Sequence, residues 1–208
     1  GLGDVYKRQI YGFVYILPYG KDLIGISWFD WLRREDGPLE WIQFIEYAIS
    51  SILALLIYVR TKRKKNINSI IWLLIAFLSF VIAGEEISWG ERITGIGINS
   101  ISDINVQGET NFHNLPFFHN YLLDPIFEIS CIFLGWFGWR KFKNINALPS
   151  KELSLYFLFV ALFYFYFDLS WASTTQQIRN DQEIFEFLLS TGIFLHCYKN
   201  FKKLVFVG

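Results

Sequence analysis

Residues 70–89 read IIWLLIAFLSFVIAGEEISW, an apolar stretch with two adjacent glutamates near its end. A helix of about 20 residues crosses the ~30 Å hydrocarbon core of a bilayer. The stretch therefore predicts a membrane-spanning helix. A carboxylate in hydrocarbon costs about 2.5–3.5 kcal/mol, so Glu85 and Glu86 indicate a polar site that is hidden from lipid.

Four more apolar segments have the length of a membrane span or come close to it. They are Trp41–Tyr58, Tyr121–Trp139, Leu153–Trp171 and the shorter Ile184–Tyr198. A further stretch, Ile10–Tyr19, is only half a span long. We therefore expect an all-α fold, a polytopic transmembrane helical bundle with five complete spans and a truncated N-terminal one.

The first nine residues, GLGDVYKRQ, resemble translated sequencing-adapter sequence, and the chain contains no methionine. We expect residues 1–9 to be an artefact and leave them out of the fold reasoning. The remainder, residues 10–208, is then expected to form a single integral membrane domain.

Lysines and arginines gather in every second loop. Twelve lie on one side of the expected spans and five on the other. The positive-inside rule assigns the richer side to the cytoplasm, so the C-terminus is expected to be cytoplasmic. Acids other than Asp4 and Glu152 lie at the opposite ends of the segments. The twelve basic residues are Arg60, Lys62, Arg63, Lys64, Lys65, Arg140, Lys141, Lys143, Lys151, Lys199, Lys202 and Lys203.

Composition points to a membrane protein, with 53% hydrophobic residues and a formal net charge of zero. The absence of a long basic stripe argues against a nucleic-acid partner, and membrane lipids are the expected partners. Cys131 and Cys197 lie at different depths in separate segments, so we expect neither a disulfide nor a cysteine-based metal site.

The first motif is the polar end of residues 83–92, AGEEISWGER. If this stretch is helical throughout, Glu85, Ser88 and Arg92 share one face, and Glu86 points about 100° away. Glu85 is then expected to pair with Arg92, directly or through Ser88. The alternative is a span that ends in inert, solvated charges.

The second motif is residues 105–115, NVQGETNFHNL, within a loop of about thirty residues between two expected spans. Six polar hydrogen-bonding side chains lie between Asn105 and His113. A histidine beside carboxylates can act as a general base, a proton relay or a metal ligand. The alternative is an ordinary loop whose amides cap short helices and turns.

Two further acids lie too deep in their segments to reach water easily. Glu46 is about 9 Å along its helix from Glu40, and Glu128 is about 12 Å from Asn120. We expect Glu46, Glu128, His113 and one of Glu85 and Glu86 to meet in one polar pocket under the 90–120 loop. Weaker candidates are Asp168 and Glu183, which lie at segment ends; Gly84, Gly135 and Gly138 are expected to be close packing points between helices.

The two motifs together resemble an uncharacterised family of bacterial polytopic membrane proteins. Its signatures are Glu-Glu-x-Ser-Trp-Gly-Gln-Arg and Asn-x-Gln-Gly-Glu-x-Asn-Leu-His-Asn. The resemblance covers Glu35–Asn114, and this chain has Glu91 in place of the glutamine and Phe112 in place of the leucine. It implies a multi-pass protein of the bacterial inner (plasma) membrane and the same polar residues at the site, and it supplies no reaction.

Three classes of function remain open from the sequence. The favoured one is a membrane enzyme that acts on a lipid-linked or amphipathic substrate near the extracytoplasmic face. The others are a proton- or cation-coupled transporter, for which intramembrane acids are common, and a non-catalytic scaffold. The expected catalytic residues are Glu85, Glu86, Arg92 and His113, and the expected substrate-binding residues are Glu46, Gln107, Asn111 and Asn114.

A divalent cation is a possible cofactor. Carboxylate oxygens with one histidine suit Mg²⁺, Mn²⁺ or Zn²⁺ better than a soft metal. The candidate ligands are Glu86, Glu109, His113 and Glu128. Hydrogen bonds among these groups and Arg92 are the alternative, because they would satisfy the same side chains without a metal.

Overall fold

The structure is a computed structural model that describes residues 25–34, 37–62, 66–105, 107–117, 123–170 and 176–206. Within these residues the chain is helical and has no strand. The side chains of Asp168 and of a few other helix-end residues, the expected half-span Ile10–Tyr19 and residues 1–9 lie outside the described part. The all-α expectation is therefore confirmed for the residues that the structure describes.

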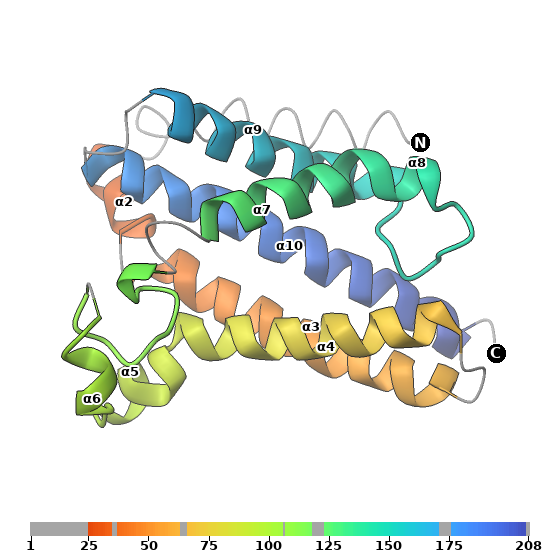
Figure 1. The fold of residues 1–208 in the computed structure, drawn as a ribbon, viewed down its shortest axis with the longest axis horizontal. Coiled ribbons are helices and arrows are strands. Elements are labelled where there is room, and N and C mark those ends of the chain that lie inside the picture. The colour runs from red at the N-terminus through yellow and green to blue at the C-terminus, as the bar shows by residue number, and fades with distance from the viewer. Residues whose placement is uncertain are drawn as a thin grey trace.

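The described residues form five helical rods, which lie side by side in Figure 1. The first two are α3 (Pro38–Thr61) and α4 (Ile67–Glu86). The third begins as α7 (Leu123–Ile132), continues as a π-helical stretch (Phe133–Gly138) and ends as α8 (Trp139–Lys141). The last two are α9 (Ser154–Ser170), preceded by a short 3-10 turn (Lys151–Leu153), and α10 (Gln176–Phe206). Shorter helices are α2 (Ile26–Leu32), α5 (Glu91–Thr94) and α6 (Asn99–Ser102).

Local sequence signals mark where the first two rods begin. Gly37 precedes Pro38, whose fixed φ suits the first turn of α3. Asn66 caps α4 by accepting a hydrogen bond from the Ser69 amide at 3.1 Å. The expected segments therefore match helices, although α10 begins eight residues before the expected Ile184, because hydropathy does not register the polar first turns of a helix.

Helix α10 is the centre of the bundle. It packs against α3 on one side and α9 on the other, while α4 packs against α3 and α7 packs against α9 (Figure 1). Glycines allow close approach at two of these contacts. A Cβ at Gly135 would lie 2.8 Å from Leu158 of α9, and one at Gly192 would lie 2.8 Å from Tyr156. The expectation of close packing holds for Gly135, whereas Gly138 mainly faces its own helix.

Two apolar cores hold these layers together. One joins α7, α9 and α10 around Phe157, Val160 and Phe185, and the other joins α3, α4 and α10 around Ile57 and Trp72. Phe157 and Val160 are completely buried. Burying one such side chain contributes about 1.5–3 kcal/mol, so these cores hold the helices against one another.

Helices α3 and α4 are long and apolar enough to cross a membrane, and they are the two that qualify among the described residues. Only 28% of the most apolar window of each is buried inside the molecule. Ile52, Ile70 and Phe77 are each about 60% exposed. A water-soluble protein would bury such surface, which weakly indicates that these helices contact lipid.

The two ends of the bundle differ in chemistry. One end holds α2, α5 and α6, together with the last turns of α4 and the first turns of α3 and α10, and is called the site end here (Figure 1). The other holds α8, the 3-10 turn before α9 and the last turns of α10, and is called the basic end. The twelve basic residues named in the sequence analysis, as far as the structure describes them, lie at the basic end. Glu152 is an acid at this end and lies beside Lys199.

Candidate functional site

A strained turn follows α4 at the site end. The backbone φ is 47° at Ser88, 53° at Trp89 and 96° at Gly90, all in the left-handed region. Such a conformation costs a non-glycine residue about 1–2 kcal/mol and persists only where neighbouring groups hold it. Here the Trp89 indole lies against Gly84, where a Cβ would come within 2.9 Å of the ring. Gly84 is thus a close packing point, but its partner is Trp89 and not another helix.

The turn overturns the expected pairing of Glu85 with Arg92. The two residues would share a face only in a continuous helix, and the left-handed turn ends α4 before Arg92 is reached. Arg92 pairs instead with Glu40 of α3 and with Glu109, whose Oε2 lies 3.2 Å from its guanidinium.

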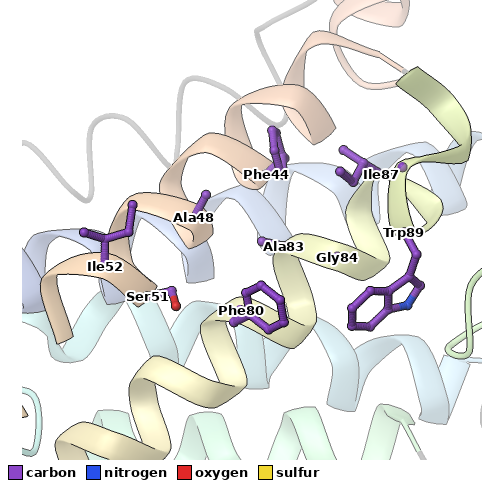
Figure 2. A pocket seen from close by; sticks show the side chains of 10 residues that line it. Phe44, Ala48, Ser51, Ile52, Phe80, Ala83, Gly84, Ile87 and Trp89 are labelled. Atoms are coloured by element: carbon purple, nitrogen blue, oxygen red, sulfur yellow. The ribbon is translucent and has the colours of Figure 1, made fainter. Parts of the chain in front are cut away.

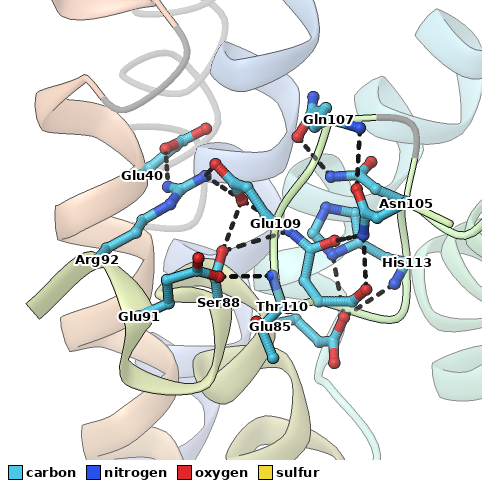
Figure 3. Close-up of polar contacts among 12 residues, drawn as sticks. Glu40, Glu85, Ser88, Glu91, Arg92, Asn105, Gln107, Glu109, Thr110 and His113 are labelled. Carbon is cyan, nitrogen blue, oxygen red and sulfur yellow. Dashed lines mark hydrogen bonds and ion pairs between the residues drawn. The ribbon is translucent and has the colours of Figure 1, made fainter. Parts of the chain in front are cut away.

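Glu85 joins the end of α4 to the loop that carries His113 (Figure 3). Its Oε2 accepts hydrogen bonds from the backbone amides of Phe112 at 2.7 Å and His113 at 2.9 Å. The same oxygen lies 3.1 Å from His113 Nδ1, and Oε1 accepts from Trp89 Nε1. The Glu85 side chain is 13% exposed and the His113 side chain 39% exposed. The carboxylate is therefore enclosed, while the imidazole reaches the surface.

Glu109 is the second node of the network. Its Oε2 accepts from Ser88 Oγ at 2.6 Å and from Asn111 Nδ2 at 2.8 Å, in addition to its ion pair with Arg92. These contacts tie the strained turn at Ser88 to the loop. Because Arg92 also reaches Glu40, the loop is fastened to α3 as well.

The loop amides mainly bond to one another. Asn105 Nδ2 donates to the carbonyl and side-chain oxygens of Asn111, both at 2.8 Å, and Asn114 Nδ2 donates to Gln107 Oε1. Glu91 accepts from the Thr110 amide at 2.6 Å. Gln107, Asn111 and Asn114, the expected substrate-binding residues of the loop, thus set its shape.

The other expected site residues lie on different helices. Glu46 of α3 accepts hydrogen bonds from Ser190 at 2.6 Å and Thr191 at 3.0 Å on α10. Glu86 is half-buried and interacts electrostatically with Glu186 of α10 and with Glu40 and Arg92. Glu128 lies half-buried on α7. The structure brings Glu85 and His113 into contact, and it places Glu46 in a separate contact between α3 and α10.

The expected metal-ligand set is not assembled in this arrangement. No three His, Cys, Asp or Glu side chains of the described residues lie close enough to share a metal ion. The Glu109 carboxylate bonds to Ser88, Asn111 and Arg92, and His113 Nδ1 faces Glu85. A metal held by Glu86, Glu109, His113 and Glu128 therefore stays a prediction from the sequence.

Three residues gain a role that the sequence did not assign. Glu40 holds Arg92, Glu91 holds the Thr110 amide, and Trp89 bonds Glu85 while lining a groove. The sequence feature that could have indicated them is their position, because each lies at the same end of an expected span as the two polar motifs. Position alone does not distinguish a site residue from an interfacial one.

An apolar groove of about 450 Å³ runs between α3 and α4 beside this network (Figure 2). Its walls include Phe44, Ala48 and Ile52 of α3 and Phe80 and Ala83 of α4. The Trp89 indole closes it at the site end. The groove therefore ends at the residue that donates to Glu85.

Comparisons with protein-family models, with curated proteins and with solved structures gave no match to this chain. The functional argument therefore rests on the geometry of these residues.

Proposed function

We propose that this chain is a multi-pass protein of the bacterial inner membrane with its C-terminus in the cytoplasm. In this proposal the α7–α8 rod, α9 and α10 cross the membrane together with α3 and α4, as in the polytopic family that the two motifs resemble. Support comes from the basic end of the bundle, because cytoplasmic ends carry the excess of Lys and Arg. Exposed apolar side chains on the α7–α8 rod, such as Ile129 at 67%, support it further.

A reporter fused after Lys203 tests this topology. A cytoplasm-active reporter is expected to work there, and a periplasm-active one is expected to stay silent. Periplasmic activity after Lys203 would reverse the orientation and move the site end to the cytoplasm.

We further propose that the protein is an enzyme that acts on an amphipathic or lipid-linked substrate, with His113 as general base. The observation that carries this is the Glu85–His113 pair, in which the carboxylate lies 3.1 Å from Nδ1. A carboxylate that accepts the Nδ1 proton fixes the tautomer and leaves Nε2 as the basic atom. At 39% exposure the ring can reach a substrate. His113 would remove a proton from water or from a substrate hydroxyl, and Glu85 would stabilise the imidazolium that forms.

The groove supplies the reason for an amphipathic substrate. Its lining is mainly apolar, so a hydrocarbon chain fits it. Trp89 links it to the pair, since the indole lines the groove and its Nε1 donates to Glu85. A chain in the groove would leave its polar head at the level of His113. Arg92 and the side-chain amides of the loop are proposed to position the Glu85–His113 pair, because their contacts are with other protein groups.

The test is turnover of lipids in nanodiscs made from a bacterial membrane extract, followed by mass spectrometry. Wild-type protein is expected to consume one lipid class, and His113→Gln is expected to slow this about 10²–10⁴-fold, the usual contribution of a positioned base. Asp103→Asn is the matched control, because Asp103 is exposed in the same loop. Consumption of no lipid by the wild type, or equal rates for His113→Gln, would remove the proposal.

A second variant tests the groove separately from the chemistry. Ala48→Phe would fill it and is expected to lower kcat/KM about tenfold or more, mainly through KM. Leu74→Phe adds the same ring at an exposed position of α4 outside the groove lining and serves as the control. Equal kinetics for Ala48→Phe and the wild type would mean that the substrate chain lies elsewhere.

A further inference from the structure

A second polar group lies inside the bundle at the site end, between α3, α4 and α10. Its carboxylates are Glu40, Glu86, Glu183 and Glu186, and each interacts electrostatically with at least two of the others. Glu40 is buried and the other three are half-buried. These four residues are called the interior acidic group. The proposed base His113 is not part of it.

Among the described residues, the carboxylates of this group outnumber the cations whose interaction with them is resolved. Among the described residues, Arg92 is the cation that interacts with it, and Arg92 is shared with Glu109 of the loop. The other titratable side chains of the described residues that interact with it are Glu85, Tyr47 of α3 and Tyr164 of α9, none of which is a cation. Buried carboxylates that lack a counter-charge are strongly destabilising.

Hydrogen-bond donors to this group are also few among the described residues. Gln43 is completely buried; its Nε2 donates to Glu183 Oε2 at 3.1 Å, and its Oε1 accepts no hydrogen bond from a described residue. Tyr164 and Gln182 donate to Glu186. No residue in the described part of the chain donates a hydrogen bond to the Glu86 carboxylate. A buried acceptor without a donor costs about as much as a lost hydrogen bond, and native structures rarely leave one.

The shortage of positive charge and the shortage of hydrogen-bond donors point to the same kind of ligand. A metal ion would supply charge, but no three acidic side chains of the described residues are close enough to hold one. A primary ammonium group supplies a unit charge and three N–H donors on one atom. We infer that the interior acidic group binds a small primary ammonium cation, held by Glu86, Glu183 and Gln43 Oε1.

This site is independent of the proposed enzyme chemistry. The ammonium is held by side chains of α3, α4 and α10, whereas the Glu85–His113 pair belongs to the end of α4 and the loop. The ion pairs of Arg92 with Glu40 and Glu109 connect the two. Loss of turnover in His113→Gln therefore says nothing about this site, and the binding measurement below does not depend on turnover.

Thermal unfolding of the purified protein in detergent tests the inference with three salts at equal ionic strength. Methylammonium chloride is expected to raise Tm by about 5–10 °C at roughly a hundred times its Kd. Tetramethylammonium chloride carries the same charge without N–H donors and is expected to leave Tm unchanged, as is sodium chloride. An equal rise with all three salts would show ionic strength alone, and a rise with sodium or with added MgCl₂ but not with methylammonium would show a metal site. Either result overturns the inference, and so does no rise at all.

Variants locate the binding. Glu86→Gln and Glu183→Gln are each expected to raise the Kd for methylammonium at least tenfold, and Gln43→Leu is expected to raise it less. Glu152→Gln removes a carboxylate at the basic end and is the matched control, with an unchanged Kd. An unchanged Kd in both Glu86→Gln and Glu183→Gln would place the cation elsewhere and overturn the inference. The comparison of methylammonium with tetramethylammonium in wild-type protein remains decisive if a variant does not fold.

Discussion

Replacing Glu85 with glutamine changes the charge at the junction between α4 and the loop and preserves the shape of the side chain. In the wild type, one carboxylate oxygen accepts the backbone amides of Phe112 and His113 and the other accepts Trp89 Nε1. Glutamine has a single acceptor oxygen. Whichever way its amide turns, an NH₂ group faces an N–H donor on one side.

The size of the effect follows from these contacts. Hydrogen bonds to a charged group are worth about 1 kcal/mol more than neutral ones, and the contacts of Phe112 and Trp89 with Glu85 are exposed, so water can replace a lost acceptor there. The loop is therefore expected to lose about 1–2 kcal/mol of local stability at Phe112 and His113. Since 1.4 kcal/mol corresponds to a factor of ten, opening there becomes about 5- to 30-fold more frequent.

Hydrogen–deuterium exchange of loop peptides from protein in nanodiscs measures this opening directly. Exchange at the amides of Phe112 and His113 is expected to accelerate by that factor in Glu85→Gln. Glu91→Gln, which touches the single amide of Thr110, is the matched comparison and is expected to affect Phe112 and His113 less. Exchange at these two amides within threefold of the wild type would refute the role assigned to Glu85.

Two further predictions concern the rest of the molecule. Gly135→Ala places a methyl group 2.8 Å from the Leu158 side chain and 3.0 Å from its backbone nitrogen, so it is expected to destabilise the contact between the π-helical stretch and α9 by about 1–3 kcal/mol. Ser130→Ala on the exposed side of α7 is the control, and equal Tm values for the two variants would contradict the packing argument. At the basic end, the hydrogen bond and charge of Lys199 lower the pKa of Glu152. The Lys199–Glu152 pair therefore stabilises the folded protein fully above the pKa that Glu152 has in the unfolded chain, about 4.3. This stabilisation is lost as the pH falls through the lower pKa of Glu152 in the folded protein. Lys199→Gln is expected to lose a small stabilisation at pH 7 and to differ less from the wild type at pH 3, and an equal difference at both values would contradict the pairing.

The helical layout was accessible from the sequence, because it depends on local patterns. Apolar segments located the rods, and Pro38 and Asn66 marked the start of α3 and α4. The N-terminal part of α10 was not located, since its polar first turns resemble a loop by hydropathy. The pairing of Glu85 with Arg92, expected if residues 85–92 were helical throughout, does not form, because contacts of Trp89 with Gly84 and Glu85 hold a turn that local propensity disfavours.

The sequence indicated which residues belong to the site, but it did not indicate which of them contact one another. Carboxylates in apolar segments are costly wherever they lie, so the sequence identified Glu85, Glu86 and Glu46 as groups that need partners. It did not identify which partner each has. Glu85 bonds to His113, and Glu46 bonds to Ser190 and Thr191, residues more than a hundred positions away.

The sequence by itself determined an all-helical chain with apolar helices, basic residues at one end and acids at the other, because hydropathy and charge act along the chain. Only the tertiary structure decided that α10 lies between the α3–α4 and α7–α9 layers and that the acids divide between the loop network and the interior acidic group. The physical reason is that hydrogen bonds and ion pairs need atoms within about 3 Å. Separations of that size depend on how helices cross and where turns end them. The sequence of a single segment does not determine them.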